Sequence, residues 1–131
     1  MTQAQLLADG IEEMNLPVSQ QAQEKLLAYL KLLQKWNKVY NLTSVRDPLD
    51  MVTLHLLDSL SVLPYIKTKS LLDVGSGGGL PGIVLAICIP DLQVTTIDTV
   101  QKKTIFMRQV KGELGLSNCT VVHARVEKYV A

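Results

Sequence analysis

The sequence has little excess charge, few cysteines and no long apolar run. Its 131 residues carry 13 basic and 12 acidic side chains, which give a formal net charge of +1 at pH 7. This balance excludes a strong overall attraction to nucleic acid or to a membrane surface, so any such contact must be local. The longest apolar stretch, residues 83–89, is too short to span a bilayer, and the first residues lack the pattern of a signal peptide. We therefore expect a soluble, cytoplasmic protein.

The two cysteines, Cys88 and Cys119, are far apart and lack the spacing of metal ligands. Isolated thiols of this kind are typical of buried, reduced cysteines, so we expect no metal site. No glycine is followed by the Gly-Lys-Ser/Thr of a P-loop, which excludes that kind of phosphate site. With 47% hydrophobic and 19% charged residues, the chain is long enough to bury a core and fits one globular unit.

The first part of the chain has the apolar periodicity of helices. A first helix is expected to end at the Asn-Leu-Pro of residues 15–17, and a second is expected to begin at Ser19 as its N-cap. Their expected buried positions are Leu6, Leu7, Ile11 and Met14 in the first, and Leu26, Leu27, Leu30, Leu33 and Val39 in the second. On the other face of the second helix, Lys31, Lys35 and Lys38 form one stripe. This stripe is either an ordinary solvated face or a contact with RNA phosphates.

A third helix is predicted to begin at Asp47-Pro48, because aspartate is a good N-cap and proline suits the first helical position. It is expected to run to about Leu63, with two alternative sets of buried positions: Met51, Leu54, Leu57 and Leu60, or Leu56 and Leu63. His55 and Asp58 lie at i and i+3 on this helix and can form a hydrogen bond. That pair either ties the helix to its neighbours or contacts a cofactor or substrate.

From Ser70 the pattern changes to alternating strands and helices. Strands are predicted at residues 71–74, 93–98 and 119–123, with helices at 82–89 and 102–114. Such units form a parallel sheet with right-handed crossovers, here in the order 3-2-1. We expect a helical region, residues 1–69, packed on the first half of a doubly wound α/β domain, residues 70–131, as one structural unit. A ligand cleft in such a fold needs strands on the other side of strand 1, so we expect this chain to be the N-terminal portion of a larger protein.

A glycine-rich turn follows the first predicted strand, and its spacing matches a dinucleotide-binding fingerprint. Gly77-x-Gly79-x-x-Gly82 lies between a strand and a helix, and Asp98 follows Gly75 by 23 residues at the end of the next strand. An acidic residue there can accept hydrogen bonds from ribose hydroxyls. The unpaired N–H groups at the start of the following helix are expected to face the ligand.

Asp73 distinguishes between the cofactors that use such a turn. A carboxylate beside the loop repels a pyrophosphate but favours the sulfonium and ammonium of S-adenosylmethionine. Residues 124–127 follow the third strand, where backbone N–H groups of Val126 and Glu127 either read an adenine edge or simply begin a helix. The residues thus favour a cationic adenosyl cofactor, with a nicotinamide cofactor as the alternative.

Four stretches together resemble one known family. They are residues 36–48 (WNKVYNLTSVRDP), His55-x-x-Asp58-Ser59, residues 73–82 (DVGSGGGLPG) and residues 124–127 (ARVE). In order and spacing the chain closely resembles the bacterial ribosomal RNA small-subunit methyltransferase G family, also called glucose-inhibited division protein B.

The resemblance implies a Rossmann-like class I S-adenosylmethionine-dependent methyltransferase fold, truncated after the third strand and preceded by a helical extension. It implies methyl transfer to N7 of a guanine in 16S ribosomal RNA, with the RNA or the small-subunit particle as partner. The sequence does not give the oligomeric state, and a monomer is favoured for the full-length protein. By the same resemblance Gly75, Leu80, Val126 and Glu127 match cofactor-contacting positions, and Asp98 takes the ribose position. Gly77 and Asp73 complete the expected cofactor site.

One segment of the family's site is missing from this sequence. An arginine-containing segment that follows strand 4 in the family has no counterpart here, so the chain by itself is expected to be inactive. Because N7 of guanine needs no deprotonation, no catalytic side chain is assigned. The expected RNA contacts are Lys31, Lys35, Lys38, Arg46 and Arg125. Two alternatives remain open: a nicotinamide-dependent oxidoreductase and a non-catalytic RNA-binding fragment.

Overall fold

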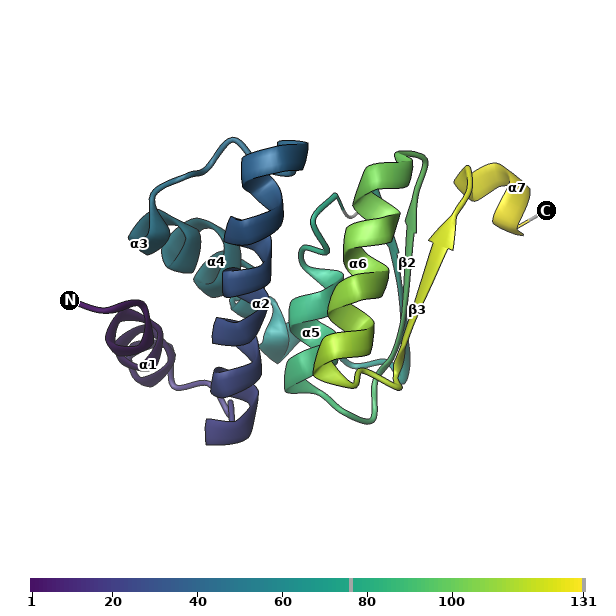
Figure 1. The fold of residues 1–131 in the computed structure, drawn as a ribbon. Helices are drawn as coiled ribbons and strands as arrows, with labels where there is room; N and C mark the ends of the chain where they lie inside the picture. Colours follow the sequence, from purple (N-terminus) through teal and green to yellow (C-terminus); the bar gives the residue numbers. More distant parts are fainter. Residues whose placement is uncertain (76, 131) are drawn as a thin grey trace.

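A computed structural model describes residues 1–75 and 77–130 (Figure 1). The first half of the chain is helical and the second half alternates strands with helices. The helical half contains α1 (Gln3–Met14), α2 (Gln20–Tyr40), α3 (Pro48–Met51), the π-helical segment η1 (Val52–Leu57), α4 (Asp58–Leu60) and the 3₁₀ turn η2 (Leu63–Tyr65). The other half contains β1 (Ser70–Val74), α5 (Gly82–Cys88), β2 (Gln93–Asp98), α6 (Gln101–Leu114), β3 (Cys119–His123) and α7 (Val126–Val130).

Side-chain caps set the beginnings of the first helices. The Ser19 hydroxyl accepts a hydrogen bond from the Ala22 N–H at 3.0 Å, and Asp47 Oδ1 accepts from the N–H groups of Leu49 and Asp50. Both residues were predicted as N-caps, and both predictions are confirmed. Each cap gives a partner to N–H groups that the first helical turn cannot pair internally.

The third predicted helix differs from the expectation in its middle and at its end. Residues 52–57 form a π-helical segment, and the helical run ends at Leu60, ahead of the predicted Leu63. Because π-helical turns contain more residues than α-helical turns, a period of 3.6 residues misassigns the faces. Leu54, expected to be buried, is 54% exposed, and the prediction for Val39 near the end of α2 is also wrong because it is 72% exposed.

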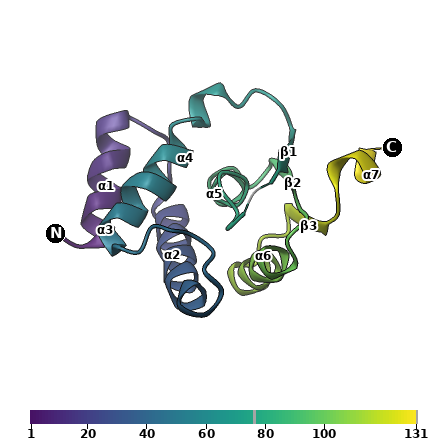
Figure 2. The ribbon, with the colours of Figure 1, turned by 90° about the horizontal axis from the view of Figure 1, so that it is seen from above.

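The sheet is parallel with strand order β1-β2-β3, so the predicted order 3-2-1 is confirmed. Helices α5 and α6 cover one face, as right-handed crossovers between neighbouring parallel strands require, and α2 packs against both (Figure 2). The buried core is continuous from Leu7 on α1, through Leu30 on α2, to Phe106 on α6. The fold is therefore one flank of a Rossmann-like α/β sheet, with the helical region packed on its covered side.

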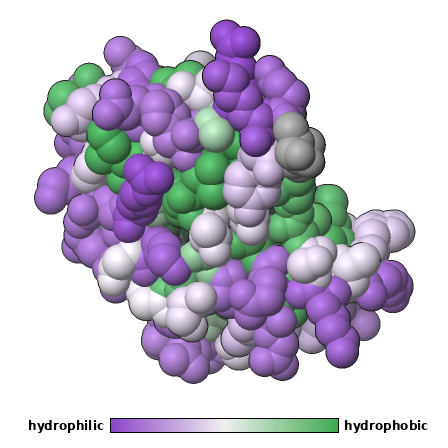
Figure 3. Space-filling model, turned by 90° about the vertical axis from the view of Figure 1, so that its right-hand side faces the viewer, coloured by the Kyte–Doolittle hydropathy of each residue, from purple (hydrophilic) through white to green (hydrophobic). Residues whose placement is uncertain are grey.

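The opposite face of the sheet carries exposed apolar side chains. Leu72 and Val74 of β1 are 42% and 52% exposed, although parallel sheets normally have both faces covered. Figure 3 views the molecule from this side and shows hydrophobic surface in the middle of the face, bordered by hydrophilic residues. Strand β1, which pairs with β2, is the sheet's first strand in the order and has no second neighbour among the described residues.

A buried asparagine holds the base of the α/β half together. The Asn118 amide donates to the carbonyl oxygens of Ala86, Ile89 and Leu92 at 2.9 to 3.2 Å, and its side chain is 8% exposed. Replacing Asn118 with alanine removes all three hydrogen bonds, although the Ile89 carbonyl still accepts the Leu92 N–H, so we expect the free energy of unfolding to fall by about 2 kcal/mol. Urea denaturation measures this loss. A matched change at exposed Gln109 should alter the stability by less than about 0.5 kcal/mol, and equal effects at both positions would contradict the assignment.

Candidate functional site

The glycine turn after β1 is built from residues with positive φ. Gly75, Gly77 and Gly79 have φ angles of +71°, +60° and +102°, a region that side chains disfavour. The Gly75 N–H donates to the carbonyl of Ile97 at 2.7 Å, which continues the pairing of β1 with β2 into the turn. A Cβ placed on Gly75 would meet nothing within 4 Å, so its outer side is open. Ser76, which belongs to the same motif, lies outside the described residues.

Asp98, at the end of β2, fixes the glycine turn through a hydrogen bond from the turn's backbone. One carboxylate oxygen accepts the Gly77 N–H at 3.0 Å, and the other accepts the Val100 N–H at 2.8 Å. The side chain is only 7% exposed. Asp98 thus fixes the position of the turn relative to the sheet, a role that the sequence fingerprint did not include.

Asp73 also has a structural role. Its Oδ2 accepts the Gly82 N–H at 2.8 Å, and the Ile83 N–H donates to the carbonyl of Gly79 at 2.7 Å. The prediction that the first N–H groups of this helix face a ligand is therefore wrong for these two residues. The strand pairing explains why: Asp73 lies beside the buried Thr96, on the face of the sheet covered by α5, and so reaches the start of that helix.

A cavity of about 320 Å³ lies at the carboxyl ends of the three strands. Four of the residues predicted for a cofactor lie in its lining: Gly75, Asp98, Val126 and Glu127. Asp73, Gly77 and Leu80 do not line it. Arg125, which was grouped with the RNA contacts, lines this cavity. The carboxyl ends of parallel strands are the usual location of ligand sites in α/β sheets, so this cavity is the candidate cofactor site.

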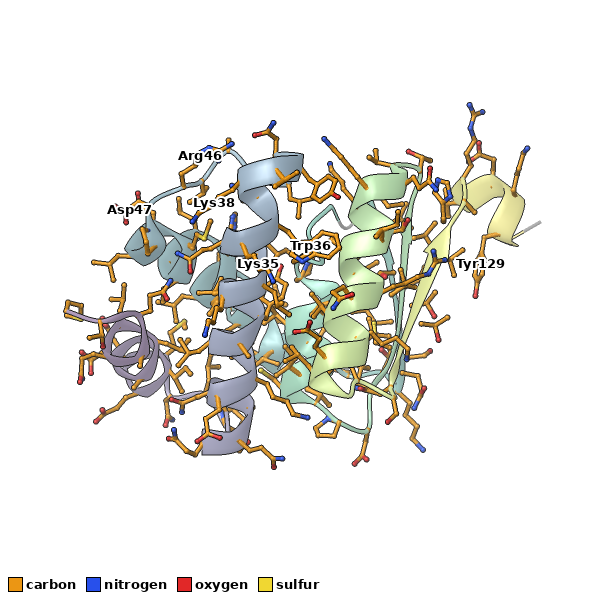
Figure 4. All side chains as sticks on the ribbon, in the orientation of Figure 1. Lys35, Trp36, Lys38, Arg46, Asp47 and Tyr129 are labelled. Carbon is orange, nitrogen blue, oxygen red and sulfur yellow. The ribbon has the colours of Figure 1, made fainter. Side chains whose placement is uncertain are left out.

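A second hollow, of about 510 Å³, lies between α2 and α3. We call it the basic hollow, because Lys31, Lys35, Lys38 and Arg46 line it, and no carboxylate belongs to its described lining. Figure 4 shows Lys38, Arg46 and Asp47 together at this end of the helical region, with Tyr129 of α7 at the opposite side of the molecule. The structure therefore brings together four of the five predicted RNA contacts and separates Arg125 from them.

Two side chains fix the loop that contributes Arg46 to the basic hollow. Asn37, which is 2% exposed, accepts the Thr43 N–H at 2.9 Å. The Thr43 hydroxyl lies 2.9 Å from His55 Nε2, so the imidazole pairs with Thr43 instead of the predicted Asp58. Burial lowers the pKa of His55, and the Leu54 backbone and the Asp58 carboxylate oppose that shift. The partners of His55 thus favour the interpretation of a structural link between the loop and the third helix.

One residue that contacts the glycine turn was not predicted from the sequence. Tyr29 of α2 donates its hydroxyl to the carbonyl of Gly78 at 2.6 Å. Its position between Leu26 and Leu33 puts it on the buried stripe of the helix. A tyrosine in an apolar stripe needs a partner for its hydroxyl, and that requirement is the signal that could have found it.

A parallel sheet with a glycine turn after its first strand and a buried carboxylate at the end of its second strand defines a class of cofactor-binding domain. The chain contains one flank of a Rossmann-like domain of the kind that binds adenosyl or dinucleotide cofactors.

Comparison with known proteins narrows this class to a family. The family model described as rRNA small subunit methyltransferase G matches residues 22–131. The chain belongs to this family, and the resemblance recognised from its motifs is confirmed.

Relatives with the name ribosomal RNA small subunit methyltransferase G match nearly the whole chain. The protein from Methylobacillus flagellatus is 68% identical over 95% of this chain and 61% of its own length. Those from Ectopseudomonas mendocina and Hydrogenovibrio crunogenus are 56% and 59% identical, over 60% and 55% of their own lengths. The chain thus spans about three fifths of the length of these relatives.

Among the described residues, none of the helices combines the length and apolar character needed to cross a membrane.

Proposed function

We propose that the protein containing this chain transfers a methyl group from S-adenosylmethionine to N7 of a guanine in 16S ribosomal RNA. The observation that carries the proposal is the cavity lined by Gly75, by Asp98 at the end of β2 and by Glu127 beyond β3. The family and the names of the relatives support methyl transfer to ribosomal RNA.

The residues of the cavity fit an adenosyl group. The open side of Gly75 gives a ligand access to the backbone, and a side chain there would occupy that space. Each carboxylate oxygen of Asp98 accepts one backbone N–H, and an ionised carboxylate has about four acceptor positions. Asp98 can therefore hold the turn and still accept hydrogen bonds from ribose hydroxyls. Val126 and Glu127, which line the same cavity, would contact the adenine.

S-adenosylmethionine supplies an electrophilic methyl group on a cationic sulfur. The Asp73 carboxylate, at the end of β1 and bonded to the start of α5, puts negative charge beneath the turn. That charge favours a cation over a pyrophosphate, although Asp73 does not line the cavity. Because guanine N7 already has a lone pair, the protein's task is to hold the base and the donor in line and to exclude water.

The basic hollow suits the phosphate backbone of the RNA substrate. Lys31, Lys35 and Lys38 lie exposed along one face of α2, and Arg46 reaches the same hollow from the loop before α3. Contacts between cations and phosphates position an RNA without reading its sequence. We place the RNA backbone at the basic hollow. Arg125, which lines the cofactor cavity, would contact the RNA separately there.

Reversing two charges in this hollow tests its role. We expect Lys35→Glu combined with Lys38→Glu to weaken binding of a 16S ribosomal RNA fragment by at least about tenfold, and to flatten the dependence of log K on log salt by roughly 1 to 2. Fluorescence anisotropy at several salt concentrations measures both. The matched control reverses Lys67 and Lys69, which are exposed and do not line the hollow. An equal loss in both double variants would show a nonspecific charge effect.

A thermal-shift comparison tests the choice of cofactor. S-adenosylhomocysteine, the demethylated product, should raise the melting temperature of the chain, whereas NADH should leave it unchanged. Stabilisation by NADH alone would reverse this order and favour an oxidoreductase. Salt-sensitive RNA binding without an effect of either compound would favour a non-catalytic RNA-binding role.

A further inference from the structure

A buried tyrosine of α2 contacts the glycine turn directly. The Tyr29 hydroxyl donates to the Gly78 carbonyl across 49 residues of sequence, and the side chain is 0% exposed. Burial raises the pKa of Tyr29, so the hydroxyl stays protonated and remains a donor across the physiological range. A helix outside the α/β half therefore supplies a fixed hydrogen bond to the turn.

Packing holds the Tyr29 side chain in this position. Its ring lies 6.2 Å from that of Phe106 on α6, and Phe106 in turn lies 5.6 Å from the ring of Trp36. A Cβ placed on Gly78 would lie 3.5 Å from Leu33 and 3.8 Å from the Tyr29 oxygen, which shows that α2 packs against the turn itself. The hydroxyl cannot leave Gly78 without disturbing this aromatic cluster.

Among the described residues of the turn, Gly78 lies between two glycines that are fixed by other hydrogen bonds. On one side, Gly77 is bonded to Asp98; on the other, the Gly79 carbonyl is bonded to Ile83. Between them, the peptide that joins Gly78 to Gly79 connects glycines, which have little steric resistance to rotation. The tyrosine hydroxyl is the partner that fixes the direction of this peptide.

We infer that Tyr29 is a positioning residue for the cofactor turn, acting by orienting the Gly78 carbonyl. The helical region thereby becomes part of the cofactor site, although it does not line the cavity. The identity of the ligand rests on the proposed function, whereas the effect on the turn does not.

Tyr29→Phe tests the inference, because phenylalanine keeps the ring and removes only the donor. In the chain labelled with ¹⁵N-glycine, the signals of Gly78 and Gly79 should shift or split, while those of Gly112 and Gly115 stay in place. Affinity for S-adenosylhomocysteine should fall by roughly 5- to 20-fold, as expected for the loss of one buried hydrogen bond. Unchanged Gly78 and Gly79 signals would overturn the inference, whatever the affinity.

Controls separate positioning from stability and from the proposed function. Tyr65→Phe, at a side chain that is 78% exposed, should alter neither readout. Leu7→Val, at a buried position of α1, should lower the melting temperature without shifting the Gly78 and Gly79 signals. If these signals shift in Leu7→Val as well, the effect of Tyr29→Phe is a loss of stability, which contradicts positioning. If the unaltered chain does not bind S-adenosylhomocysteine, the proposed function fails, and the glycine signals of Tyr29→Phe still test whether Tyr29 positions the turn. If Tyr29→Phe does not fold, 3-fluorotyrosine at position 29, a stronger donor, must shift Gly79 or the inference is overturned.

Discussion

Asp98→Ala is expected to remove measurable binding of S-adenosylhomocysteine and to destabilise the glycine turn. The change leaves the N–H groups of Gly77 and Val100 without their acceptor. Each lost partner costs about 1 to 3 kcal/mol, and hydrogen bonds from the ligand to a charged acceptor contribute about 1.5 to 3 kcal/mol more. Together these losses predict a fall in affinity of at least about 100-fold, with a fall in unfolding free energy of about 2 to 6 kcal/mol.

Calorimetric titration and urea denaturation measure the two effects separately. Asp98→Asn should give an intermediate result, because one amide oxygen can replace only one of the two carboxylate acceptors. Asp91→Ala, in the exposed connection between α5 and β2, is the control and should leave both quantities unchanged. If Asp98→Ala binds the ligand as tightly as the unaltered chain, Asp98 has no place in the site.

Gly82→Ala, at the start of α5, is expected to be strongly destabilising. The added Cβ would lie 2.7 Å from Asp73 Oδ2 and 2.9 Å from Thr96 Cγ2, closer than such atoms can approach. The start of α5 must then move away from the sheet, which weakens the bond from Gly82 to Asp73. Overpacking together with the weakened bond predicts a loss of about 2 to 4 kcal/mol in unfolding free energy.

Gly112→Ala provides a matched control within the same protein. Gly112 lies inside α6, and a Cβ there meets nothing within 4 Å. Because alanine favours helix over glycine, this variant should gain about 0.5 to 1 kcal/mol. Thermal or urea denaturation of both variants should therefore give effects of opposite sign. Destabilisation of both to the same degree would show that close packing is not the reason Gly82 is required.

Local chemistry in the sequence was sufficient for the α/β half. Proline, glycine and β-branched residues mark its boundaries clearly, and β3 was predicted with its observed ends, Cys119 and His123. The alternation of strands and helices then leaves few possible topologies, so the strand order followed. The third helix was less predictable, because its π-helical segment breaks the period on which the burial of Leu54 was judged.

The site could be predicted as a set of positions but not as a set of contacts. The spacing of Gly75 and Asp98 indicated a ligand-binding turn, and both residues line the cavity. The hydrogen bond from the Gly82 N–H to Asp73 depends on which face of the sheet the Asp73 side chain occupies. The hydrogen bond from Tyr29 to the Gly78 carbonyl joins positions 49 residues apart. Such contacts arise from tertiary packing, which spacing in a single sequence does not encode.

Binding of an adenosyl cofactor at the turn between β1 and α5 is tested most directly by a titration followed by NMR. S-adenosylhomocysteine is added to the ¹⁵N-labelled chain, with Gly75→Val as the matched variant that fills the open side of the turn. The predicted result is saturable shifts of Gly75, Gly77, Asp98, Val126 and Glu127, absent in Gly75→Val, with the lysines of the basic hollow unaffected. The absence of shifts, or shifts that persist in Gly75→Val, would contradict the account.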